Sequence, residues 1–163
     1  MRKFVLLLLA AGLVFAGSFR DLYPYLIDLP GWNASKPEGS STKIPFVGTA
    51  VVEAHREYTR GNATVRVTVG KGKGVMMAWA PFAMNMEYED EHGWRKVKNI
   101  NGFQVGIQYD KEGKSGSVVV NLTMGEQTVG VLDLEYEGIT PDEALELAKK
   151  FDWKKIASVL QKL

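Results

Sequence analysis

The chain has 163 residues and a formal net charge of +1, and it contains 17 glycines and no cysteine. Hydrophobic residues make up 45% of the chain and charged residues 24%, a balance that is typical of one globular domain and excludes a disordered tail. The near-neutral charge provides no general attraction for nucleic acid, so no nucleic-acid partner is expected. Because there is no cysteine, stability must come from packing and hydrogen bonds without disulfides.

The N-terminus has the pattern of a secretory signal peptide over residues 1–16. Arg2 and Lys3 precede an apolar stretch, 4–15, and small residues surround a cleavage point after Ala16. The apolar stretch is shorter than the ~20 residues that a membrane-spanning helix needs, so membrane contact is expected only if this segment stays uncleaved. We therefore predict an extracytoplasmic protein, secreted or at the cell surface. Cleavage would change its net charge from +1 to −1.

Residues 17–43 are predicted to be a lead-in and linker before a single α+β domain over 44–163. A short helix or turn is expected at 19–32, where prolines interrupt the pattern. The Ser-, Gly- and Pro-rich stretch 33–43 has no apolar period and is expected to be a loop. Strict alternation of apolar and polar residues then predicts two strands, 49–58 and 63–69, which form a hairpin.

Two further hairpins follow a mid-chain helix. Strands at 94–100 and 103–109 are joined by Asn101-Gly102, the strongest short hairpin signal. Strands at 117–124 and 127–136 turn around Gly125-Glu126. The predicted fold is therefore α+β, an antiparallel sheet of about six strands in the order β-β-α-β-β-β-β-α, with the helices packed on it.

The C-terminus is predicted to be a helix pair. Thr140 to Glu143 form a capping box with proline at the first helical position. Two apolar stripes begin at Ala144 and Trp153, nine residues apart, which is half a rotation at 100° per residue. One straight helix would face both ways, so we predict a break near Asp152, which can cap the second helix.

Three Asn-x-Ser/Thr sequons, at Asn33, Asn62 and Asn121, support the interpretation as an exported glycoprotein. On the predicted strand 117–124, Asn121 lies on the face opposite the apolar residues, so its side chain is expected to point to solvent. Coincidence is the alternative for such short motifs. If the host glycosylates the chain, all three positions should be on the surface.

The stretch MAWAPFAMNM, residues 77–86, combines methionines with a tryptophan. Thioether sulfurs select Cu(I) over harder ions. Trp79 followed by Met84-Asn85-Met86 locally resembles the signature of the periplasmic copper/silver efflux chaperone family, over about ten residues. In that family two methionines and a histidine ligate the ion and a tryptophan covers it. The resemblance implies a Cu(I)/Ag(I) site of Met84, Met86, His92 and Trp79.

Core packing is the other interpretation of the same stretch, and we favour it. Met76, Ala80, Ala83 and Met84 follow the spacing of one helix face, and methionine commonly fills irregular core space. On a strand Met84 and Met86 would project to the same side and could share an ion, whereas on a helix they diverge by ~200°. No cofactor is therefore predicted.

Other polar patterns have simple explanations. Glu53, His55 and Glu57 share a strand face and could hold zinc, but such a row is usually solvated. The glycine- and lysine-rich stretch 70–74 lacks phosphate-loop spacing and is expected to be a flexible loop. The acidic run 87–94 lacks the order of a calcium loop and is expected to be a charged turn.

No set of acid, base and nucleophile stands out, so we predict a protein that is not an enzyme. The sequence favours a non-catalytic binding or structural module, whose partner and oligomeric state it does not indicate. Two alternatives stay open. One is a Cu(I)/Ag(I)-binding protein. The other is a carrier of an apolar ligand or lipid, held between a curved sheet and the Met-rich segment.

Overall fold

The structure, a computed structural model, describes residues 17–46 and 48–163. The predicted signal peptide, 1–16, lies outside the described residues. None of the helices within the described ranges is long and apolar enough to cross a membrane.

Within the described residues, nine strands and five short helices follow one another. The N-terminal half contains η1 (Phe19–Tyr25), β1 (Asn33–Ala34), β2 (Glu38–Ile44), β3 (Gly48–Arg60), β4 (Ala63–Gly72), α1 (Lys73–Met76) and η2 (Met77–Phe82). The C-terminal half contains β5 (Tyr88–Glu89), β6 (Gly93–Ile100), β7 (Phe103–Asp110), β8 (Ser115–Met124), β9 (Gln127–Glu137), α2 (Pro141–Ala148) and α3 (Trp153–Lys162).

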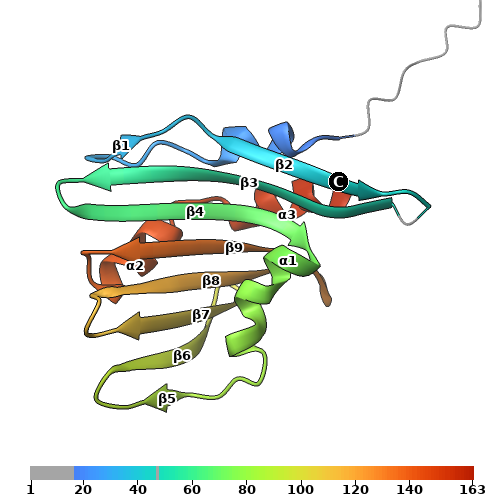
Figure 1. Ribbon diagram of the computed structural model, residues 1–163. Helices are drawn as coiled ribbons and strands as arrows, with labels where there is room; N and C mark the ends of the chain where they lie inside the picture. The colour runs from blue at the N-terminus through green and yellow to red at the C-terminus, as the bar shows by residue number, and fades with distance from the viewer. Residues whose placement is uncertain (1–16, 47) are drawn as a thin grey trace, which may run out of the picture.

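The strands form one antiparallel sheet, which confirms the predicted α+β class. Its order is β1-β3-β4-β9-β8-β7-β6-β5, and β2 also pairs with β3. Figure 1 shows α2 and α3 behind this sheet and α1 in front of it. The sheet therefore has two different faces, one covered by the C-terminal helices and one covered only in part.

The three predicted hairpins are present, with the turns where the sequence placed them. Asn101 and Gly102 join β6 to β7, and both have positive φ, 52° and 83°, as a type I′ turn requires. Gly125 turns the chain between β8 and β9 with φ 63°. These turns set the register, so that alternate residues of each strand reach the same face.

The main core fills the space between the sheet and the helices behind it. Each central strand contributes alternate apolar residues, and the fully buried ones include Val67, Val118, Leu132 and Leu134. Ala148, Ile156 and Leu160 on the helices meet them. The apolar faces of the strands and of the C-terminal helices thus form a single core on the back face of the sheet.

The C-terminal helix pair has the predicted break and N-caps, but only the Thr140 half of the predicted capping box is formed, and the Glu143 carboxylate pairs instead with Arg60. The Thr140 hydroxyl accepts a hydrogen bond from the Glu143 N–H at 3.1 Å, and the Asp152 carboxylate accepts one from the Lys155 N–H at 3.1 Å. The Trp153 indole N–H donates to the Ala148 carbonyl at 2.8 Å across the break. These bonds satisfy groups that the helix ends would otherwise leave unpaired.

The N-terminal segment differs from the prediction, because it forms strands and contributes to the core. The predicted loop over 33–43 is wrong, because this stretch contains β1 and most of β2, which pair with β3. The lead-in before it also belongs to the core, where Leu22, Leu26 and Leu29 are buried. The Arg56 guanidinium holds the N-terminal segment against β3 by donating hydrogen bonds to the Leu26 and Ser35 carbonyls, at 2.6 and 2.7 Å.

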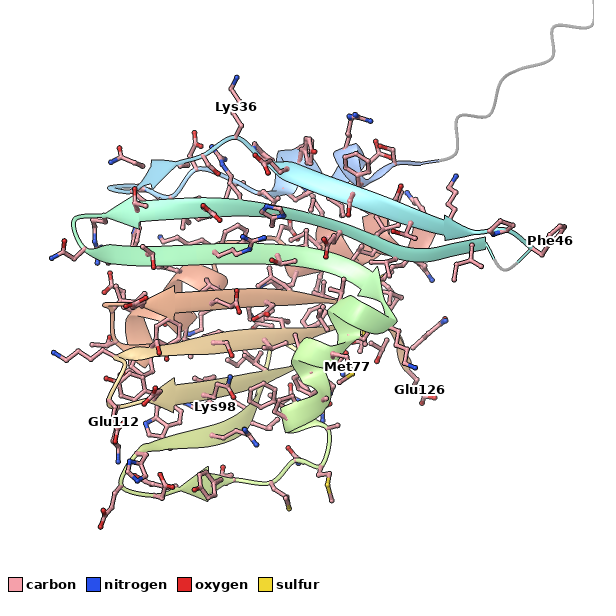
Figure 2. All side chains as sticks on the ribbon, in the orientation of Figure 1. Lys36, Phe46, Met77, Lys98, Glu112 and Glu126 are labelled. Atoms are coloured by element: carbon pink, nitrogen blue, oxygen red, sulfur yellow. The ribbon has the colours of Figure 1, made fainter. Side chains whose placement is uncertain are left out.

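The far edge of the sheet is only partly paired. β5 pairs with two residues of β6, Arg95 and Trp94. Among the described residues, no strand lies on the outer side of Lys96 and Lys98, whose inner side pairs with β7. Lys98, labelled in Figure 2, lies on this edge strand.

A second, smaller cluster lies on the front face. Val75 of α1 and Phe82 of η2 pack on Val119 and Val131 of the sheet. The Phe82 ring lies directly over Gly106, where an added Cβ would come within 2.3 Å of the ring. The glycine therefore allows η2 to approach β7, and α1 and η2 cover one part of the front face.

Candidate functional site: a polar groove on the front face

A groove of about 960 Å³ occupies the part of the front face that α1 and η2 leave open. Its wall on one side is formed by Met77, Ala78 and Pro81. Figure 2 shows Met77 on the short helical segment that crosses the front of the sheet. The groove is large enough for a drug-sized ligand, because such pockets measure about 300–1,000 Å³.

The floor of the groove is made of alternate side chains of five strands. The register of β4, β9, β8, β7 and β6 aligns one lateral row across the sheet: Arg66, Glu135, Ser117, Gln108 and Arg95. The residues between them on each strand point to the other face of the sheet. The same alternation that builds the core thus gives the floor its polar character.

Asp133 is the most unusual residue of the floor. It pairs with Thr68 of β4 and Val119 of β8 in the central part of the sheet. Its Oδ1 is buried and has no hydrogen-bond partner. Burial, together with the charge of Glu135, raises the pKa of Asp133 from 3.8 to about 7, because a low dielectric disfavours the charged carboxylate.

Asp133 is the first of three carboxylates along β9 that line the groove. Glu135 and Glu137 follow it at alternate positions, and both are exposed. Among the described residues, no ion pair involves any of the three. Arg66, which lies next to Glu135 in the register, pairs instead with Glu57 at 2.9 Å. The centre of the groove is therefore acidic.

The outer rim of the groove is the acidic run predicted to be a charged turn, but only residues 90–92 form the turn, because Tyr88–Glu89 is strand β5 and Gly93 begins β6. Asp90 accepts hydrogen bonds from the His92 and Gly93 N–H groups, at 2.8 and 2.9 Å, and from the Tyr88 hydroxyl. The hydrogen bond from Tyr88 is the main cause that lowers the pKa of Asp90, and the same bond raises the pKa of Tyr88. These bonds fix the shape of the rim.

The residues of the predicted metal site are found in different settings. Met84 and Met86 are 76% and 61% exposed. Trp79 packs on Phe82 with ring centroids 5.6 Å apart, and the His92 Nδ1 lies 2.7 Å from a Glu112 carboxylate oxygen. In the part of the chain that the structure describes, no group of three His, Cys, Asp or Glu residues could hold a metal ion.

The prediction that methionines of this segment fill the core is wrong for three of them. Met76 packs against the second cluster, but Met77, Met84 and Met86 are exposed. The helical pattern ends early, because η2 stops at Phe82 and the chain turns through Asn85, which has φ 53°. Met84 and Met86 therefore lie on neither a helix nor a strand.

The sequons also differ from one another. Asn33 and Asn62 are exposed, as expected. Asn121 lies on the predicted face of β8, but it is only 7% exposed and its Oδ1 has no hydrogen-bond partner. The expectation that it points to solvent is wrong, because Val131 beside it belongs to the cluster that α1 and η2 cover.

The predicted solvated row on β3 is partly shielded. The His55 side chain is 20% exposed, and its Nε2 lies 3.8 Å from the carboxylate of Glu38 on the neighbouring strand β2. Glu57 pairs with Arg66 across β3 and β4. Two residues of this row therefore contact polar side chains of the neighbouring strands.

Sequence reasoning missed the groove, although it placed several of its residues on the outer face of their strands. Polar residues opposite a buried face indicate contact with water in the first instance. The signal that distinguished this site was three acidic residues at alternate positions of one strand, 133, 135 and 137, without basic residues between them.

No family model matches the chain, and no curated protein and no solved structure matches it either.

Proposed function

We propose that this chain is an exported, non-catalytic binding module and that it holds a polar ligand in the groove on the front face of its sheet. The export part of the proposal is supported by the signal-peptide pattern of residues 1–16 and by the exposure of Asn33 and Asn62. The binding part is supported by the groove.

The observation that carries the proposal is the unpartnered carboxyl of Asp133. Buried polar atoms in proteins almost always have a hydrogen-bond partner, and leaving one unsatisfied costs about 1–3 kcal/mol. Asp133 lines the groove, and none of the described protein groups bonds to its Oδ1. A ligand donor that reaches the Asp133 carboxyl from the groove would form a hydrogen bond there.

The shape of the groove indicates what kind of ligand fits. Met77, Ala78 and Pro81 provide an apolar wall, and the strands provide a polar floor. This combination of apolar contact area and a few oriented polar groups is typical of ligand sites. The polar floor favours a polar ligand over the apolar ligand or lipid of the alternative carrier hypothesis.

A binding role also fits better than catalysis. Within the described ranges, the histidine side chains contact carboxylates, His55 with Glu38 and His92 with Glu112, and neither bonds to a serine or threonine hydroxyl. Ser117 on the floor therefore lacks the adjacent base that activates a serine nucleophile. The described histidines therefore do not supply the base of a serine nucleophile in the groove.

The experiment that tests the proposal blocks the groove without changing the core. Glu135 is exposed, so Glu135→Trp places a bulky ring over the floor, and Glu126→Trp at an exposed turn is the matched control. Amide NMR shifts would be recorded with three probes of similar length: spermidine, triethylene glycol and pimelate.

At least one probe should change the NMR chemical shifts of the β9 and β8 amides in the wild type and in Glu126→Trp. These changes should be absent in Glu135→Trp. The groove would be excluded as a binding site if no probe shifted these amides, or if Glu135→Trp left the shifts unchanged.

A further inference from the structure

The three carboxylates of β9 also indicate the chemical class of the ligand. We propose that the groove binds an extended oligocation, whose amino or guanidinium groups pair with Asp133, Glu135 and Glu137. This inference rests on the proposed function and deepens it.

The spacing of the carboxylates is set by the strand. Residues two apart on a strand lie on the same face and are separated by about 6.8 Å along it. Leu134 and Tyr136, which alternate with the three carboxylates, are buried on the opposite face. β9 therefore presents a straight row of three acceptors along the groove, between β4 and β8.

The groove has more acidic than basic groups, and each of its two guanidinium groups has a contact outside the β9 row. Six carboxylates and two guanidinium groups line it. Arg66 pairs with Glu57 at 2.9 Å, and Arg95 donates to the Pro81 carbonyl at 3.4 Å while lying over the Phe82 ring. Neither guanidinium forms an ion pair with the β9 row. Cations from a ligand would supply the missing charge.

Two sources of such a ligand share this chemistry. A small oligoamine carries several ammonium groups on one flexible chain. A basic peptide in extended conformation carries a side chain on the same side at every second residue, with the same repeat of about 6.8 Å as β9. In both cases methylene groups next to the charges could contact the wall formed by Met77, Ala78 and Pro81.

The pH dependence of binding follows from the position of Asp133. A cation binds the ionised carboxylate, and the ionised fraction rises from about one tenth at pH 6 to about nine tenths at pH 8 when the pKa is about 7. The affinity should therefore rise about tenfold between these pH values. A ligand that accepts a hydrogen bond from the neutral carboxyl would show the opposite trend.

Other charged groups face Asp133 or lie near it on the front face, and the test must separate their effects. Glu135 follows Asp133 on β9, and β8 contributes Ser117 and Val119, which do not ionise near neutral pH. η2 carries no ionisable side chain. The remaining charged or titratable groups come from β3, β4, β6 and α1, and they include Glu53, His55, Glu57, Arg66, Arg95 and Lys73.

The experiment is a calorimetric titration of the whole chain with two cationic probes, spermidine and an acetylated, amidated Lys-Thr-Lys-Thr-Lys peptide. The peptide with glutamine in place of lysine, together with pimelate, provides the uncharged and anionic controls. Asp133→Asn, Glu135→Gln and Glu137→Gln each remove one carboxylate of the row. Glu126→Gln removes an exposed carboxylate outside the groove.

At pH 8 we expect Asp133→Asn to weaken cation binding about tenfold and each of the two glutamate variants to weaken it about two- to fivefold. Glu126→Gln should have no effect. The tenfold rise between pH 6 and pH 8 should be absent in Asp133→Asn. Binding of spermidine alone would assign a small oligoamine, and binding of the peptide alone would assign a basic strand.

Equal binding of the glutamine peptide or of pimelate would overturn the inference of a cationic ligand and leave the groove as a binding site. Cation binding that Asp133→Asn, Glu135→Gln and Glu137→Gln do not weaken would also overturn it. Absence of binding by every probe, cationic or not, would contradict the proposed function as well.

Discussion

The stability of the protein should fall as the pH rises from about 4 to about 7, and Asp133 is the reason. Its pKa is about 7 in the folded state and near 3.8 when solvated. Between these values the folded state binds more protons than the unfolded state, so stability decreases with rising pH. Each pH unit of this interval is worth about 1.4 kcal/mol, which gives about 4 kcal/mol over the whole interval.

Asp133→Asn should remove this dependence, because asparagine has nearly the same shape and does not ionise. The free energy of unfolding would be measured by guanidinium denaturation at several pH values between 4 and 8, for the wild type, Asp133→Asn and Glu126→Gln. The wild type should lose up to about 4 kcal/mol relative to Asp133→Asn across this range, and Glu126→Gln should follow the wild type. A difference between wild type and Asp133→Asn that does not change with pH would refute the reasoning.

Four further predictions concern other parts of the chain. Gly106→Ala should lower the free energy of unfolding by about 1–3 kcal/mol, because its Cβ collides with Phe82; unchanged stability in chemical denaturation would show that η2 does not lie there. Thr140→Ala should cost about 1 kcal/mol through loss of the α2 cap, and Thr140→Ser should restore most of it. Cu(I) titrated under reducing conditions should leave tryptophan fluorescence unchanged, since Trp79 packs in the second cluster; quenching would support the Cu(I)/Ag(I) site instead. Mass spectrometry of the secreted protein should identify a chain that begins at Gly17, and a chain that still includes residue 1 would contradict cleavage.

The sequence predicted those parts of the fold that depend on local pattern and chain geometry. The turn at Asn101-Gly102 requires residues that tolerate positive φ, and the break at Asp152 follows from two apolar stripes half a rotation apart. Both are properties of neighbouring residues. They can be derived without knowing what lies across the sheet.

The parts that the sequence did not predict depend on distant partners. β2 has exposed, polar residues, and it is a strand because the edge of β3 is available to it. Met84 and Met86 are apolar residues of a type that is common in cores, but the chain turns at Asn85 and leaves both side chains exposed. The partial burial of Asp133 depends on the surrounding strands and the nearby segment formed by α1 and η2, not on its own neighbours in sequence.

The partly paired edge of β6 has a consequence for how copies of this protein behave at high concentration. An open strand edge offers backbone hydrogen bonds to any other strand, and natural proteins often place lysines there to prevent association. Lys96 and Lys98 lie on this edge. Repulsion between these lysines on approaching molecules would keep the sheets of separate copies from joining into longer ones, so we expect the solubility of the protein to depend on two side chains that do not line the groove.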